Sequence, residues 1–199
     1  MLKKSSKILE CSLLFALCAA LCAGTWANAR QSSISGDLLR LHVVAVSDDE
    51  YEQALKLRVR DRVLDYLRPK LENIEKCEES RELIQSELRG IAEAAAGAAE
   101  GRTVTVSLGR EFFPTKSYGD FSLPAGEYES LRVILGEGKG HNWWCVVFPP
   151  LCTDTVSGGK LKSVMNETDY KIVTEEEGYE LRFRTLELWG EVKNFLRKF

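Results

Sequence analysis

The sequence predicts an α/β (α+β) domain, a small mixed β-sheet with helices packed mainly on one side. Three stretches alternate with the period of two that is typical of strands, and a fourth is a further run rich in strand-forming residues. Two longer stretches between the first and second of these strands repeat apolar residues at helical spacing. The chain has 199 residues, of which 44% are hydrophobic, and this is enough to bury one self-sufficient core.

The N-terminal residues have the three parts of an export signal. Lysines precede an apolar run over 11–23, which is shorter than the roughly 20 residues that span a bilayer. Ala27 and Ala29 supply the small side chains that a signal peptidase needs, so we expect cleavage after Ala29. Residues 1–29 are therefore predicted to be a signal peptide and the working domain to be secreted. The alternatives are an uncleaved anchor and a buried core helix.

Charge and composition divide the remaining chain and exclude one class of partner. Residues 1–29 carry three lysines and one glutamate, so their loss changes the formal charge from −3 to −5. This acidity argues against nucleic acid as a partner, because phosphate neutralisation needs a clustered basic surface. We expect a short tether at 30–37, one domain at 38–153, and a polar linker with a C-terminal amphipathic helix near 179–199 in the segment 154–199.

The first half of the domain reads as a strand followed by two helices. Residues 39–46 are apolar on both faces, which indicates a central strand. Ser47 and Glu50 fit a capping box at the start of a helix that Pro69 should end. A second helix is expected over 80–100, before a glycine.

The second half reads as three strands and an aromatic loop. Residues 103–108 alternate as a strand, whereas 110–126 are too broken for regular structure and too aromatic for a solvated linker. We expect an ordered loop there. Residues 128–135 and 143–148 are predicted to form an antiparallel pair, joined by the glycine-rich segment 136–140.

Three cysteines remain after the expected cleavage. Cys145 and Cys152 are close in sequence and separated by two prolines, so they are candidates for a disulfide in an oxidising exterior. Cys77 would then be unpaired. The alternative is that all three are small buried side chains.

The sequence contains few groups that suggest catalysis. His42 lies inside an apolar strand and His141 at a turn, where structural roles are expected. A Cys/His hydrolase that uses Cys145 or Cys152 with a histidine is the alternative function. The cysteines and histidines lack closely spaced metal-ligand pairs, so we predict no metal. Residues 136–140 lead into a strand and lack the lysine motif of a phosphate loop, so no cofactor or small-molecule substrate is predicted either.

A series of short motifs runs in order through residues 38–153. They are Arg-Leu-His-Val at 40–43, Gln-Ala-Leu-Lys-Leu-Arg-Val-Arg-Asp at 53–61, Phe-Pro-Thr-Lys at 113–116, Pro-Ala-Gly at 124–126, and the long run from Gly136 to Cys152 that contains Asn-Trp-Trp-Cys. Together these motifs resemble the stage II sporulation protein R family. The last run is long enough that chance similarity is negligible.

The resemblance implies a signalling role in endospore-forming bacteria. The family protein is understood to be made in the forespore and exported into the space between the forespore and mother-cell membranes. There it activates a membrane-embedded aspartic protease, the stage II sporulation protein GA, which removes the pro-sequence of the sigma-E factor. The resemblance thus implies a protease as partner and no enzymatic activity of the chain itself.

The resemblance supplies no catalytic residues, so candidates for partner contact come from residue types. Aromatic residues are concentrated in the later strands, and exposed aromatic and arginine side chains dominate many interfaces. The candidates are Arg40, Lys116, Tyr118, Trp143 and Trp144. Core packing or an internal hydrogen bond is the alternative for each.

Overall fold

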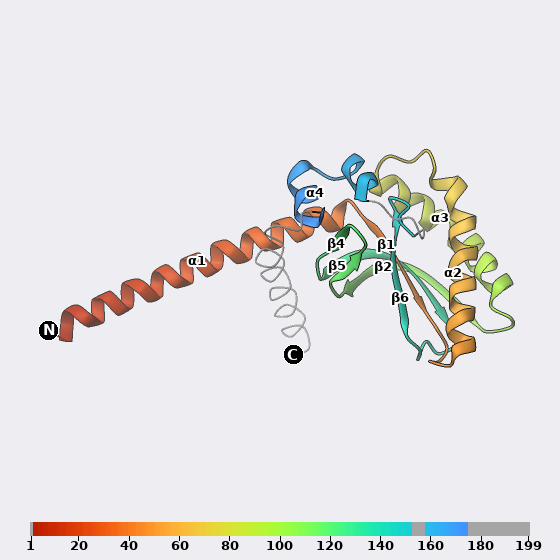
Figure 1. Cartoon of the computed structure of the whole chain (residues 1–199), viewed down its shortest axis with the longest axis horizontal. Coiled ribbons are helices and arrows are strands. Elements are labelled where there is room, and N and C mark those ends of the chain that lie inside the picture. Colours follow the sequence, from red (N-terminus) through yellow and green to blue (C-terminus); the bar gives the residue numbers. More distant parts are fainter. Residues whose placement is uncertain (1, 153–157, 175–199) are drawn as a thin grey trace.

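The protein is built on a four-stranded sheet. The computed structural model describes residues 2–152 and 158–174 (Figure 1). The strand order is β2-β5-β1-β6, with bounds β1 Leu39–Val44, β2 Val104–Phe113, β5 Gly126–Leu135 and β6 Asn142–Phe148. β1 pairs parallel with β5 and antiparallel with β6, and β2 pairs antiparallel with β5. The sheet is therefore mixed and β1 is central, which confirms the predicted fold class.

Two long helices cover the first face of the sheet. They are α2, Glu50–Leu71, and α3, Cys77–Ala98, and Figure 1 shows both on the same side. Side chains alternate along β1, so Leu41 and Val43 face these helices and are fully buried. They pack with Val59, Ile84 and other apolar side chains in the larger core.

Shorter elements cover part of the second face. They are the end of α1, Leu2–Gly36; the hairpin of β3, Lys116–Tyr118, and β4, Phe121–Leu123; the 3-10 helix η1, Gly158–Ser163; and α4, Glu167–Thr174. Phe113 and Tyr128 from the sheet meet Ile34, Leu123 and Ile172 from these elements in a second core. The domain is therefore held by two cores, one on each face of the sheet.

α1 is one helix that extends far from the domain (Figure 1). Residues 30–36, expected to be a tether, form its last two turns, and Ile34 and Ser35 are buried against the second core. Over Glu10–Gly36 this helix is long and apolar enough to cross a membrane, and among the described residues it is the one helix that is.

The glycine-rich segment after β5 does not form a hairpin, so the predicted pairing of β5 with β6 is wrong. β1 lies between these strands. The segment instead crosses the end of β1, where the N–H groups of Lys139 and Gly140 donate to the carbonyls of Val46 and Ala45. A side chain at Gly140 would overlap the Ser47 carbonyl, so glycine allows this close crossing.

The ends of α2 also differ from expectation. Asp49 rather than Ser47 is the N-cap residue, and it makes no side-chain capping bond. Ser47 instead accepts from the Asp49 N–H and donates to its carboxylate, which forms a local turn. Pro69 lies inside the helix, which ends at Leu71, because a proline in the last turn interrupts few backbone bonds.

Two expected irregular segments contain regular structure. β2 continues to Phe113, and β3 and β4 form a hairpin inside the expected loop 110–126. Part of the expected polar linker, 158–174, forms η1 and α4. The helix expected near 179–199 lies outside the described residues.

Candidate partner-binding site

A buried arginine organises the second core. Arg40 on β1 is fully buried, with its guanidinium carbon 4.0 Å from the ring centroid of Phe113 and 4.9 Å from that of Tyr128. Its Nη2 donates to the Tyr118 hydroxyl at 2.5 Å. Among the described residues, none accepts a hydrogen bond from its Nε or Nη1. We call Arg40, Phe113, Tyr118 and Tyr128 the Arg40 cluster. The electron-rich ring faces stabilise a charge that pairs with no carboxylate of the described ranges.

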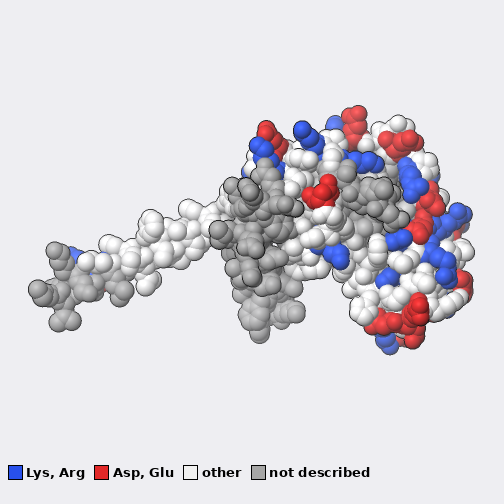
Figure 2. All heavy atoms as spheres, viewed as in Figure 1, with Lys and Arg blue, Asp and Glu red and all other residues white. Residues whose placement is uncertain are grey.

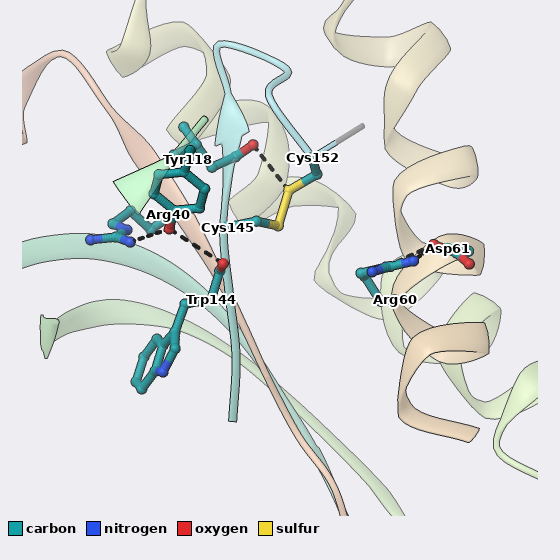
Figure 3. The surroundings of a disulfide bond; sticks show 8 residues. Arg40, Arg60, Asp61, Tyr118, Trp144, Cys145 and Cys152 are labelled. Atoms are coloured by element: carbon teal, nitrogen blue, oxygen red, sulfur yellow. Dashed lines mark hydrogen bonds and ion pairs between the residues drawn. A yellow bond between two sulfur atoms is a disulfide. The ribbon is translucent and has the colours of Figure 1, made fainter. Parts of the chain in front are cut away.

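The Arg40 cluster attaches the β3–β4 hairpin to the sheet. Tyr118 lies on the hairpin, and its hydroxyl also donates to the backbone carbonyl of Trp144 at 3.3 Å (Figure 3). Burial raises the pKa of Tyr118, and the neighbouring Arg40 opposes this shift. Lys116, on the same hairpin, is exposed. The structure thus places Arg40 inside the domain and Lys116 on its surface.

The two adjacent tryptophans face opposite sides of the sheet. Trp144 stacks on the His42 ring at 3.8 Å and meets Phe113 edge-on at 4.5 Å. Trp143 faces α2, where the guanidinium of Arg60 lies 4.4 Å from its ring centroid. Both are half-buried. They therefore cannot form one continuous aromatic patch, and only Trp144 lies beside the Arg40 cluster.

A row of polar side chains crosses the second face next to Trp144. Each strand contributes one residue, and in strand order they are Glu111, Arg132, His42 and Asn142. His42 Nδ1 lies 3.1 Å from Glu111 Oε2, and His42 Nε2 lies 2.9 Å from Asn142 Oδ1. Arg132 Nε lies 3.8 Å from Glu111 Oε2. We call these four residues the polar row.

One member of the polar row is buried and the other three reach solvent. His42 is buried, whereas the side chains of Arg132 and Glu111 are 46% and 21% exposed and Asn142 is exposed. Burial tends to raise the pKa of Glu111, but the hydrogen bond with His42 and the nearby Ser130 hydroxyl, aided by the positive charge of Arg132, outweigh it and hold the pKa below its usual range. The row therefore presents to solvent the Glu111 carboxylate, which His42 holds in place, and the Arg132 guanidinium, which lies beside it.

The cysteines and histidines are not arranged as nucleophile and base. Cys145 and Cys152 form a disulfide with a Cα–Cα distance of 5.6 Å (Figure 3). Cys145 packs in the core on the first face, and His42 lies on the second. His141 pairs with Asp48 and is four residues from Cys145, roughly 13 Å along an extended chain. Among the described residues, no group of three or more His, Cys, Asp or Glu side chains could hold a metal.

Sequence reasoning missed three members of the polar row. Glu111, Arg132 and Asn142 each occupy a position whose side-chain direction follows from strand alternation. Their meeting depends on the strand order, which the alternation does not contain. The signal that could have located them is the polar histidine in an otherwise apolar central strand, because a buried imidazole needs hydrogen-bond partners from neighbouring strands.

Comparisons with known proteins identify a family that the chain resembles. The family model described as stage II sporulation protein R matches residues 35–157. Stage II sporulation protein R of Bacillus subtilis (strain 168) is 39% identical over 131 residues, which cover 64% of this chain and 58% of that protein. The match thus extends over somewhat more than half of the relative's length. No solved structure matches the chain.

The matched residues include the whole sheet, the Arg40 cluster and the polar row. The match to the family model extends over more than half of the chain. The chain therefore belongs to the stage II sporulation protein R family.

Proposed function

We propose that this chain is an exported signalling protein of sporulation, which activates a membrane-embedded aspartic protease and so leads to processing of pro-sigma-E. Membership of the family supports the role in sporulation. The apolar N-terminal helix supports passage out of the cytoplasm. In this proposal the protein is made in the forespore and acts between the forespore and mother-cell membranes.

The observation that carries the proposal is the polar row beside Trp144. The Glu111 carboxylate is held by His42, so it can contact a partner with little loss of side-chain entropy, and the Arg132 guanidinium beside it adds a positive charge. Trp144 adds a rigid aromatic surface, the kind of side chain that contributes most to many interfaces. We assign this part of the second face as the surface that contacts the protease.

The chain is proposed to act by binding, without chemistry of its own. Its disulfide holds both cysteines that the hydrolase alternative needs, and the sheet separates Cys145 from His42. His141→Ala and the double variant Cys145→Ser with Cys152→Ser test that alternative. If either abolishes sigma-factor processing while the folded protein is still exported, a catalytic role gains support.

Reversal of one charge tests the proposed contact surface. Arg132→Glu places a second carboxylate beside Glu111, and we expect processing of the sigma-factor precursor to fall about tenfold, which corresponds to about 1.4 kcal/mol of binding. Arg89→Glu makes the same charge change on α3, where the side chain is 92% exposed on the opposite side of the sheet. This control should signal like the wild type. Processing is measured as the ratio of mature factor to precursor in sporulating cells.

Both variants must first reach wild-type levels in the exported fraction. A folded and exported Arg132→Glu protein with full processing would show that the polar row is not the contact surface. Equal losses in both variants would point to a general effect of charge and would also contradict the assignment.

A further inference from the structure

β2 is an edge strand with an open outer side. It has ten residues, Val104–Phe113, and stands at one end of the strand order β2-β5-β1-β6. Successive residues of a strand direct their backbone N–H and C=O groups to opposite sides. Because the Gly136 N–H donates to the Thr103 carbonyl, the odd-numbered residues of β2 turn toward β5. The even-numbered residues therefore direct their backbone groups away from the sheet.

The outward residues of β2 are unpaired and accessible. They are Val104, Val106, Leu108, Arg110 and Phe112. Within residues 2–152 and 158–174, no other element bonds to their backbone groups. The neighbouring Thr105 and Ser107 are exposed, as is Arg110. This edge thus offers the N–H and C=O groups of five residues to another strand.

The opposite edge of the sheet, β6, is capped. The outward carbonyl of Trp144 accepts from the Tyr118 hydroxyl, and that of Val146 accepts from the Leu151 N–H. The β3–β4 hairpin and the chain after β6 therefore occupy acceptors that a further strand would need. β2 is the edge at which the sheet can grow.

β2 lacks the features that usually keep sheet edges apart. Natural edges are blunted by short strands, bulges, prolines or lysines. β2 pairs with β5 over all ten of its residues without a shift of register, and it contains neither proline nor lysine. Its charged residues, Arg110 and Glu111, are adjacent and lie nearer to its end. The remaining length can pair with a strand of matching pattern.

The side chains along β2 define the pattern of a matching strand. On the first face Val104, Val106 and Leu108 pack on the larger core but are only half-buried, so apolar surface remains at the edge. On the second face Thr105 and Ser107 are exposed. A matching strand therefore alternates apolar and small polar side chains. β2 itself has this alternation, so a second copy of the chain fits the edge.

One antiparallel register uses the whole edge. In a pair of β2 strands centred on Leu108, all five outward residues of one copy face outward residues of the other. Val106 then faces Arg110, and Leu108 faces its own copy. On the second face Glu111 lies opposite Thr105. Apolar side chains thus stay on the first face, hydroxyls stay on the second, and no charge faces a like charge.

The charge of the domain permits two copies to approach. The formal net charge of the chain is −3, or −5 after the expected cleavage. Figure 2 shows acidic and basic side chains mixed over the face in view, without a block of one sign. Long-range repulsion between copies is therefore weak at physiological salt.

We propose that two copies of this chain pair through β2, antiparallel about Leu108, and join their sheets into one. α2 and α3 of both copies then lie on one face of the joined sheet, and both polar rows lie on the other. The dimer thus presents two polar rows on one continuous surface. The pairing involves backbone groups outside the polar row and does not depend on the identity of the proposed protease partner.

Amide exchange tests the pairing residue by residue. The protein is purified after export from cells that express the full chain, and exchange of its backbone amides is followed by NMR at low and high protein concentration. We expect the even-numbered amides of 104–112 to gain protection at high concentration, whereas the odd-numbered amides, bonded to β5, are protected at both. Even-numbered amides whose exchange does not depend on concentration would overturn the proposal.

Opposite charges at Leu108 provide a matched test. Leu108→Lys and Leu108→Glu each bring two like charges face to face, so we expect either variant alone to dimerise about tenfold more weakly than the wild type. An equimolar mixture brings opposite charges together and should restore the dimer. Analytical ultracentrifugation measures association, and circular dichroism verifies that each variant is folded. Wild-type association of both single variants, or a mixture of folded variants that stays monomeric, would contradict the pairing.

An exposed position keeps the test decisive if the Leu108 variants do not fold. Thr105→Glu and Thr105→Lys change a solvent-exposed side chain that faces Glu111 of the second copy. We expect Thr105→Glu to weaken the dimer and Thr105→Lys to associate at least as well as the wild type. Equal association of these two variants would refute the register.

One further outcome would identify a different occupant of the edge. If the exported protein is monomeric at every concentration, and its even-numbered β2 amides become protected only when membranes that contain the protease are added, the added strand belongs to the protease and the self-pairing is wrong. Loss of sigma-factor processing in Arg132→Glu with the dimer retained, in contrast, would bear on the proposed function alone.

Discussion

Arg40 is a charged side chain that the fold surrounds with aromatic rings. Burial of an unpaired cation costs several kcal/mol, and two nearby ring faces together with one hydrogen bond offset part of that cost. Within residues 2–152 and 158–174, the Tyr118 hydroxyl is the one side-chain acceptor for the guanidinium, so the stability of the second core depends on this bond. The hydrogen bond between Arg40 and Tyr118 therefore helps to hold the β3–β4 hairpin on the sheet.

Removal of the Tyr118 hydroxyl should destabilise the protein much more when Arg40 is present than when it is absent. Tyr118→Phe leaves Nη2 buried without an acceptor, and we expect the free energy of unfolding to fall by about 1–3 kcal/mol. In an Arg40→Met background the same change should cost far less, because no buried charge remains. Urea denaturation of the chain in mild detergent measures the four proteins of this cycle. Equal costs in both backgrounds would contradict the role given to the bond.

Asp37 should make stability depend on pH. Burial, and then the charge of Asp169, raise the pKa of Asp37 from 3.8 to about 6. The folded protein therefore binds a proton more tightly than the unfolded chain, so stability should fall as the pH rises from about 4 to about 6 and stay low above that. Asp37→Asn removes this contribution and should raise the melting temperature at pH 7 but not at pH 4. If the variant and the wild type have the same melting temperature at both pH values, Asp37 does not cause the pH dependence.

At the scale of elements, α3 contains two glycines with different surroundings. Gly97 has open space where a side chain would lie, whereas a side chain at Gly90 would overlap the Tyr66 hydroxyl. That hydroxyl donates to Glu87 Oε2 at 2.5 Å and links α2 to α3. Gly90 is therefore a packing residue between two helices, and Gly97 is only a weak point in one of them.

Alanine substitutions should separate the two glycines. Gly97→Ala is expected to raise the free energy of unfolding by about 0.5–1 kcal/mol, because alanine is the better helix former. Gly90→Ala should lower it by about 1–2 kcal/mol, since the Tyr66 ring must move away from Glu87. The midpoint of urea denaturation reports both changes. A gain in stability for both variants would show that α2 and α3 adjust freely.

The same elements show how far the sequence can be interpreted. Alternation correctly located β1, β2 and β5, because it reports which face of a strand is buried. Composition located β6, and helical spacing located α2 and α3. These sequence patterns did not reveal that β1 lies between β5 and β6. That strand order depends on the connection at 136–141, which bonds to the backbone of residues 45 and 46, far away in sequence. Nor could these patterns distinguish Gly90 from Gly97, which differ only in the position of Tyr66.

For the candidate site, residue types identified candidate side chains but did not show which of them are buried. Trp144 and Tyr118 were identified as aromatic candidates, and they meet at the second face. Arg40 was identified from its charge and is fully buried, because three aromatic side chains from β2, β3 and β5 close over it. The sequence around Arg40 does not show that side chains from distant strands bury it. The polar row depended on the strand order in the same way.

At the scale of the whole molecule, α1 joins the sheet domain without a flexible link. Its last turns carry side chains that complete the second core, so helix and domain form one continuous body. An expected tether at 30–37 would have allowed the domain to move independently of the helix. The observed packing of Ile34 and the pairing of Arg30 with Asp169 prevent this.

The packing of Ile34 has a consequence for how the domain unfolds. The last turns of α1 and the helix α4 contribute side chains to the same core, so neither can leave the sheet without exposing apolar side chains of the other. We therefore expect the two elements to detach from the sheet in one cooperative step.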